Sequence, residues 1–231
     1  WWILGKLEQA MGMHSLFEDN DNPDPFGRLN RMLRYADLSI EQLRAAPCQT
    51  VKLPKNPTGR FYSEWLQTED KKVDCCPPLF QEAIERAHQL FSELRAEPDD
   101  QLKLISLRTN YMQNSWYHNM AELKREHQQE NPLHISPQDA KQRQLDDGDI
   151  INVFNQWGSI QARIKIDDTL RTGTVAMTHG WGNQKTPGMS VANRYPGVNI
   201  NALLPNGPGS YEKLSNQAFM SGVPVSILTT D

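Results

Sequence analysis

Residues 150–178 read IINVFNQWGSIQARIKIDDTLRTGTVAMT, and this stretch contains three short runs typical of β-strands. The runs cover 150–155, 159–166 and 173–178, and segments that contain glycine separate them, as in turns between neighbouring strands. We therefore expect three consecutive strands here, and this expectation sets the fold class of the C-terminal part of the chain.

Further strands are predicted on both sides of this stretch. The run LKLISLRT at 102–109 alternates between apolar and polar residues, and PLHIS at 132–136 and VPVSILTT at 223–230 are also strand-like. Ser136 is placed to cap a short helix that has Pro137 at its first position. About six short strands with one small helix and glycine-rich turns predict a closed β-barrel.

The part before these strands is predicted to be helical. Ser39 and Gln42 have the spacing of a capping box, in which each side chain bonds the backbone of the other residue. Residues 79–94 carry one apolar stripe at helical spacing. The segment AEPDD follows and is a candidate boundary, so we expect a helical segment at 1–96 and a closed β-barrel domain at 97–231. The fold class is thus mixed α and β.

Composition narrows the range of functions. The 231 residues are 38% hydrophobic and 23% charged, as in an ordinary soluble protein, and the net charge of −4 argues against a general nucleic-acid binder. No apolar run reaches the roughly 18 residues of a membrane span. Cys48, Cys75 and Cys76 are an odd set without a Cys-x-x-Cys pair, which favours a reducing, cytoplasmic compartment. The start WWILGKLEQAMG has neither an initiator Met nor a signal-peptide pattern, so we expect a fragment of a longer protein.

The loop after the first strand, LRTNYMQNSWYHN at 107–119, is rich in amide and imidazole side chains. Such groups pair with ligands that have many heteroatoms, for example a pterin, a purine or a diphosphate, and Arg108 suits a phosphate. A hydrated loop whose asparagines form turns fits the same pattern. Spacing alone leaves both interpretations open.

Two further loops have the same character. In THGWGN, 178–183, Trp181 can stack on a flat ring while the two glycines let the backbone approach it. In RYPGVNINALLPNGPGS, 194–210, Asn199 and Asn201 lie on one side if the segment is extended. Turn chemistry explains each loop singly, but three of them on one β domain favour a large polar ligand. The sequence contains neither a Gly-x-Ser-x-Gly elbow nor a phosphate-binding glycine loop.

Four segments together resemble the C-terminal part of the molybdopterin-dependent oxidoreductases, the superfamily of formate dehydrogenase, nitrate reductase and dimethyl sulfoxide reductase. In chain order they are LRTNYMQNSWYHN, NPLHISPQDAKQRQLDDGDIINVFN, ARIKIDDTLRTGTVAMTHGWGN and GVNINALLP. The resemblance covers about 97–231 and implies the domain that binds molybdopterin guanine dinucleotide, a double-psi-type β-barrel. It also implies that residues 1–96 are the helical end of the preceding domain in the catalytic region.

The resemblance also implies which residues face the cofactor. Arg108, Asn110, Asn114, Ser115 and His118 are expected at a guanosine or phosphate portion. The expected pterin-facing residues are His179, Gly180, Trp181, Gly182, Asn199 and Asn201, with Gln217 as a further candidate. The superfamily takes its metal ligand, and in many members an iron–sulfur cluster, from a region upstream of these segments. We therefore expect no catalytic residue and no metal ligand within the 231 residues, and no activity from this fragment alone.

Three functions remain to be compared. The first is cofactor binding in a molybdenum or tungsten oxidoreductase, with formate as the first guess for the substrate by association. The second is a non-catalytic barrel module that binds a nucleotide or a partner. The third is a non-redox hydratase on the same scaffold. The expected partners are the N-terminal remainder of the same protein and an electron-transfer subunit, with neither nucleic acid nor a membrane span in this segment.

Overall fold

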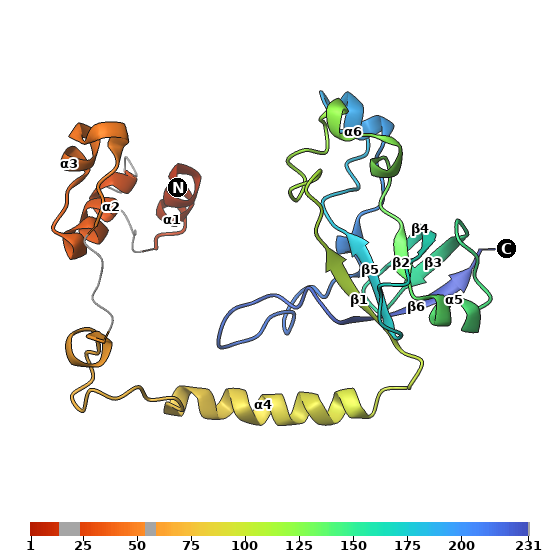
Figure 1. The fold of residues 1–231 in the computed structure, drawn as a ribbon, viewed down its shortest axis with the longest axis horizontal. Coiled ribbons are helices and arrows are strands. Elements are labelled where there is room, and N and C mark those ends of the chain that lie inside the picture. The colour runs from red at the N-terminus through yellow and green to blue at the C-terminus, as the bar shows by residue number, and fades with distance from the viewer. Residues whose placement is uncertain (14–23, 54–58, 231) are drawn as a thin grey trace. The chain divides into compact units, whose positions relative to one another are not determined.

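The structure, a computed structural model, describes residues 1–13, 24–53 and 59–230 and divides the chain into two compact units (Figure 1). The first unit is Trp1–Asp74 and the second is Cys75–Asp231. The predicted domain boundary at 96/97 stays a prediction.

The first unit is helical where it is described. Its helices are α1 (Trp2–Ala10), α2 (Pro25–Leu33) and α3 (Ile40–Ala45), with 3-10 turns η1 (Arg34–Ala36) and η2 (Pro47–Gln49) and the π-helical turn η3 (Phe61–Trp65). The predicted capping box is confirmed at the start of α3. The backbone N–H of Gln42 donates to Ser39 Oγ at 3.2 Å, and the backbone N–H of Ser39 donates to Gln42 Oε1 at 2.7 Å.

The second unit begins with the predicted long helix, α4 (Pro78–Arg95), and Pro78 occupies its first turn, where no N–H donor is needed. None of its residues is buried, so its apolar stripe is exposed within this unit. Arg86 pairs with Glu212 at 3.1 Å, which links α4 to the C-terminal segment. Backbone hydrogen bonds hold the pKa of the Glu212 carboxyl down at about 2.

The predicted closed barrel is confirmed, and it has six strands. They are β1 (Leu102–Leu107), β2 (Leu133–Ile135), β3 (Ile150–Phe154), β4 (Ser159–Ile166), β5 (Thr174–Thr178) and β6 (Val223–Thr229). The order around the barrel is β1-β5-β2-β4-β3-β6. The pairs β1–β5 and β2–β4 are parallel, and the other pairs are antiparallel.

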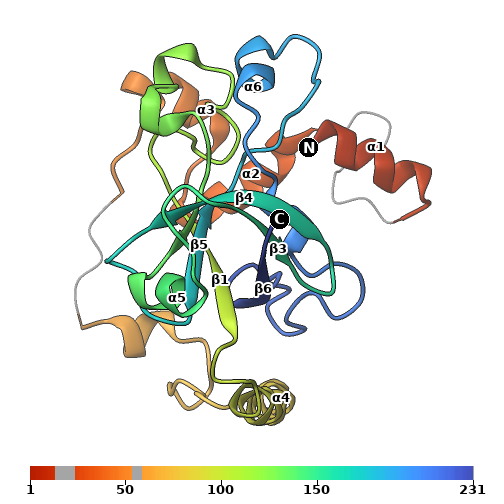
Figure 2. The same ribbon diagram turned by 90° about the vertical axis from the view of Figure 1, so that its right-hand side faces the viewer.

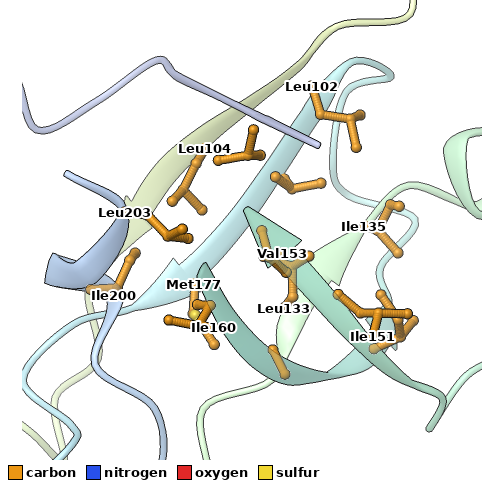
Figure 3. Close-up of a cluster of buried hydrophobic side chains, with 14 of the residues drawn as sticks. Leu102, Leu104, Leu133, Ile135, Ile151, Val153, Ile160, Met177, Ile200 and Leu203 are labelled. Atoms are coloured by element: carbon orange, nitrogen blue, oxygen red, sulfur yellow. The ribbon is translucent and has the colours of Figure 1, made fainter. Parts of the chain in front are cut away.

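The barrel interior is the hydrophobic core of the second unit (Figure 3). Strand β4 shows why these residues form a barrel wall: Ile160, Ala162 and Ile164 point inward and are buried, while the residues between them are exposed. Leu104 and Met177 fill the same interior from β1 and β5. Strand β5 lies between β1 and β2, and all its residues after Thr174 are buried.

Short helices lie at the ends of the barrel. They are α5 (Pro137–Gln142), α6 (Ser190–Arg194) and the 3-10 turns η4 (Ala121–Leu123), η5 (Glu126–Gln128) and η6 (Ile200–Leu203). The predicted cap of α5 is confirmed, since Ser136 Oγ accepts the Asp139 N–H at 3.1 Å. Both views place α6 beyond one end of the barrel, where the segments after β1 and β5 run side by side (Figures 1 and 2).

Candidate functional site

The parallel pairing of β1 with β5 brings two of the polar loops together. Leu107, the last residue of β1, is in register with Thr178, the last residue of β5. Because parallel neighbours end at the same edge of a sheet, Arg108 and His179 leave the barrel next to each other. Two segments about 70 residues apart in sequence thus begin at one point.

A cavity of about 640 Å³ lies at this edge of the barrel. The third polar loop contributes Asn199 and Asn201 to its wall, and the chain just before β6 also reaches it. The lining residues are Ser106, Arg108, Asn114, Ser115, His179, Gly180, Trp181, Gly182, Asn183, Asn199, Asn201, Met220 and Ser221. All three loops singled out in the sequence therefore meet at one cavity.

A chain of side-chain hydrogen bonds runs along one wall. Ser106 Oγ lies 2.6 Å from His179 Nδ1, and His179 Nε2 lies 2.8 Å from Asn114 Oδ1. The same Asn114 oxygen accepts a hydrogen bond from Arg108 Nη1 at 3.0 Å. Burial lowers the pKa of His179, and the charge of Arg108 lowers it further, so the ring is neutral near pH 7. Arg108 is then the one cation among the cavity-lining residues.

The two glycines of THGWGN pack against protein atoms. A Cβ on Gly180 would lie 2.0 Å from the carbonyl oxygen of Asn114, and one on Gly182 would lie 2.5 Å from Cβ of Asn199. Both residues also have positive φ angles, +90° and +98°. The glycines therefore allow the three loops to pack closely, which is a different role from approaching a flat ligand.

Trp181 is 4% exposed, and its ring is enclosed by protein. The His118 ring packs edge-on against it at 4.9 Å between centroids, and Lys124 Nζ lies 5.2 Å from its ring centroid. A Cβ on Gly197 would lie 2.5 Å from the same ring. The indole thus forms the floor of the cavity and has no open face on which a ligand ring can stack.

His118 is fully buried and joins two loops. Its Nε2–H donates to the carbonyl oxygen of Tyr195 at 2.8 Å, and its Nδ1 accepts a hydrogen bond from Asn183 Nδ2 at 2.9 Å. Burial lowers the pKa of this imidazole, and the nearby Lys124 charge adds to the effect. A neutral ring with this tautomer satisfies both partners. His118 therefore supports the cavity from behind.

The donor set of the cavity matches an anionic ligand with many heteroatoms. Its lining has one guanidinium and no carboxylate, with four Asn amides and three Ser hydroxyls around it. Within the described ranges, no group of three or more His, Cys, Asp or Glu side chains is arranged to hold a metal ion. Such a set of groups suits a polar organic molecule with a phosphate-like group.

Comparison with known proteins agrees with this geometry. Residues 102–216 match the family of the molydopterin (molybdopterin) dinucleotide binding domain, and this range holds every lining residue of the cavity except Met220 and Ser221. This chain belongs to the molybdopterin oxidoreductase superfamily. The cavity therefore lies in its molybdopterin dinucleotide-binding domain.

Relatives of the superfamily align over much of the chain. It is 28% identical over 196 residues to a putative catalytic chain of dimethyl sulfoxide reductase from Halobacterium salinarum, an alignment that covers 78% of this chain and 23% of that protein. It is 29% identical over 218 residues to the dimethyl sulfoxide/trimethylamine N-oxide reductase of Cereibacter sphaeroides, which covers 86% of this chain and 24% of that protein. The chain thus spans about a quarter of the length of these relatives.

Two further similarities are more limited. The molybdopterin-containing subunit of the arsenate respiratory reductase of Chrysiogenes arsenatis is 29% identical over 101 residues, 41% of this chain and 11% of that protein. The fold is similar to acetylene hydratase from Pelobacter acetylenicus, with a TM-score of 0.59 over 97% of this chain and 32% of that chain. At 16% identity, this second similarity concerns the fold alone.

The structure brings nine of the twelve residues predicted to bind the cofactor to the cavity of the molybdopterin dinucleotide-binding domain. These nine are Arg108, Asn114, Ser115, His179, Gly180, Trp181, Gly182, Asn199 and Asn201. Asn110 is exposed and does not line the cavity, His118 lies behind it, and Gln217 lies in a turn where its N–H donates to Ser215 Oγ. Cofactor contact by each of the twelve stays a prediction.

Three residues that shape this site were missed by sequence reasoning. Ser106 ends the apolar alternation of β1 and gave no signal beyond its place at a strand end. Asn183 follows the glycines and lines the cavity. Asn131 is buried and ties β5 to the third loop, with its Nδ2 2.9 Å from the carbonyl oxygens of both Thr178 and Val198. The sequence signal available for Asn131 was its place as the first residue of the NPLHIS segment.

Proposed function

We propose that this chain binds the pterin dinucleotide of a molybdenum or tungsten oxidoreductase in the cavity at the shared end of β1 and β5. The observation that carries the proposal is the lining of this cavity, which has Arg108 as its one cation, no carboxylate and four Asn amides. A pterin dinucleotide has the matching chemistry, since it joins negative phosphates to heterocycles with many donors and acceptors.

Two groups of residues have different roles in this proposal. Arg108 binds a phosphate, because a guanidinium offers several N–H donors and only one of them is engaged by Asn114. Asn199, Asn201 and Asn183 bind heterocycle edges. Asn199 lines the cavity, and its Oδ1 accepts the Asn201 N–H at 3.1 Å, so its amide N–H₂ is the group that we assign to the ligand. When bound, the cofactor supplies the metal for electron or oxo transfer, and the chain supplies binding and orientation.

We extend the proposal to four finer features, which rest on the sequence resemblance or the cysteine pattern. They are a guanine nucleotide, an iron–sulfur cluster upstream, a partner subunit for electron transfer and a cytoplasmic location. Among the described residues, no helix has the length and apolar character needed to cross a membrane.

The named relatives act on sulfoxide, N-oxide or arsenate. As the reaction of the whole protein, we therefore place reduction of a sulfoxide, N-oxide or arsenate ahead of formate oxidation. Non-redox hydration is the alternative on the same fold.

Cofactor retention tests the proposal. The full-length protein is purified with Arg108→Ala or Asn199→Ala, and molybdenum, tungsten and fluorescent oxidised pterin are measured per protein. Loss of a hydrogen bond to a charged group costs about 1.5–3 kcal/mol, so we expect Arg108→Ala to weaken binding by about 10- to 100-fold. Asn199→Ala should lower retention less, because its lost partner is uncharged.

Matched controls separate binding from general damage. Arg171→Ala and Asn206→Ala remove the same side chains at exposed positions outside the cavity, and both proteins should keep the cofactor. The proposal is rejected if the unaltered protein contains neither molybdenum nor tungsten, or if both cavity variants retain as much cofactor as their controls. Hydrolysis of the bound cofactor identifies its nucleotide. Release of a base other than guanine would show that the proposed guanine nucleotide is wrong.

A further inference from the structure

Ser106 makes the shortest side-chain contact of the cavity wall. It lies on β1 opposite Met177 of β5, one residue before the strand ends, and its Oγ is 2.6 Å from His179 Nδ1. Its side chain is exposed, so this hydroxyl is not needed to fill the barrel core. The side-chain partner of this hydroxyl is instead the His179 ring.

The proton positions along the wall follow from Arg108, which can only donate. The Asn114 atom that faces Arg108 Nη1 at 3.0 Å must therefore be the oxygen. The same oxygen faces His179 Nε2 at 2.8 Å, so Nε2 carries a proton. In a neutral ring Nδ1 is then the acceptor, and the Ser106 hydroxyl donates to it. The contacts thus define one tautomer of His179.

Asn114 is held in an unusual backbone conformation. It has φ +59°, and its neighbour Gln113 has φ +43°, two successive positive values at residues other than glycine. The Asn114 side chain bonds both His179 and Arg108, so the imidazole ties this turn to the end of β5. The orientation of Arg108 therefore depends on the histidine, and the orientation of the histidine depends on Ser106.

We infer that Ser106 is a positioning residue for the cofactor cavity: it fixes His179 as the Nε2–H tautomer and, through Asn114, holds Arg108 toward a bound phosphate. The phosphate part rests on the proposed function, whereas the tautomer does not. Without the hydroxyl, His179 Nδ1 has no donor, and the ring can turn and exchange tautomers. Arg108 then samples more orientations before the ligand binds, which lowers affinity.

Nitrogen NMR of His179 in the 231-residue chain tests the tautomer. Ser106→Val and Ser106→Thr both carry a branched side chain suited to a strand and differ in a methyl against a hydroxyl. We expect acceptor-type Nδ1 and protonated Nε2 in the unaltered chain and in Ser106→Thr, and a mixture of tautomers in Ser106→Val. His179→Gln assigns the signals.

A pH titration adds a readout that a purely structural role would not change. Ser106 and Asn114 face the ring without charge, and Arg108 is the charged group that acts on it. Because the hydroxyl donates to the neutral ring, its loss should raise the pKa of His179. Ser159→Ala is the control, since it removes a 2.6 Å serine contact to Asn152 on an exposed strand face away from the cavity. It should leave the His179 signals unchanged.

Cofactor retention in the full-length protein completes the test. We expect Ser106→Val to retain several-fold less cofactor than Ser106→Thr, and more than Arg108→Ala. An unchanged tautomer and pKa in a folded Ser106→Val overturn the inference. Normal retention by Ser106→Val while Arg108→Ala loses cofactor also overturns it and leaves the proposed function intact. If Ser106→Val shifts the tautomer but Arg108→Ala retains the cofactor, the phosphate contact in the proposed function is wrong.

Discussion

At the scale of single residues, the site shows how an aromatic ring next to glycines can be structural. Trp181 looks like a stacking platform in the sequence, yet His118, Lys124 and Gly197 cover its ring. The ring is a large apolar surface, and burying it against neighbouring loops stabilises their arrangement. Gly180 has the complementary role, because its missing side chain leaves room for the Asn114 carbonyl.

Gly180→Ala is therefore expected to destabilise the barrel strongly. The added methyl would overlap the Asn114 carbonyl oxygen and would also sit on a backbone with φ +90°. Gly188→Ala is the matched control, because φ is +78° there and nothing lies within 4 Å of the added Cβ. The control should lose about 1–2 kcal/mol from backbone strain alone, and Gly180→Ala about 1–3 kcal/mol more from overpacking. Urea unfolding measures both, and equal losses would contradict the packing role.

At the scale of elements, the second unit contains a well-packed barrel and an exposed helix. Strand β1 buries Leu104 in the barrel interior at 1% exposure, whereas α4 leaves Leu90 at 49% exposure. The α4 stripe has ideal helical spacing, but amphipathic spacing shows only that a face is suited to burial. The barrel strands are buried because closure of the sheet gives every inward side chain neighbours on all sides.

The same substitution should therefore have different effects on the two elements. Leu104→Ala leaves a cavity in the core and should cost about 2–5 kcal/mol in the free energy of unfolding. Leu90→Ala on α4 should change the stability of the barrel by less than about 1 kcal/mol, since little packing is lost. Denaturant unfolding followed by tryptophan fluorescence compares them. A loss at Leu90 as large as that at Leu104 would show that α4 is packed in solution.

At the scale of the whole molecule, two neutral histidines link the fold to pH. His118 is buried behind the cavity and His179 is partly buried in its wall, and burial is the main cause that lowers the pKa of each. In the unfolded chain, histidines take up protons near their ordinary pKa of about 6.5. In the folded chain, the lowered pKa values keep both rings neutral down to a lower pH. The stabilising contribution of these two neutral rings is therefore complete above the unfolded-state pKa of about 6.5, and it is lost as pH falls through the lowered pKa values of the folded state.

We expect the free energy of unfolding to fall between pH 7.5 and pH 5.5. The slope has an upper limit of about 1.4 kcal/mol per pH unit for each proton taken up. His118→Gln should lower stability at pH 7.5 but reduce the difference between the two pH values, because one of the resisting groups is gone. Asn206→Ala, at an exposed position outside the cavity, serves as the control and should keep the original difference. Urea titrations at both pH values give the result, and a pH difference that His118→Gln leaves unchanged would rule out this role.

The sequence by itself determined most of the helices and strands. Strand runs, the Ser39 and Ser136 caps and the long helix were all predicted, because each depends on residues near one another in the chain. The polar loops predicted a heteroatom-rich ligand for the same reason. Only the tertiary structure decided which side chains share the cavity. The Ser106–His179 contact joins residues 73 positions apart, and it exists because β1 and β5 are parallel neighbours in register. The enclosure of Trp181 also depends on loops that meet in space, which no local pattern of residues can specify.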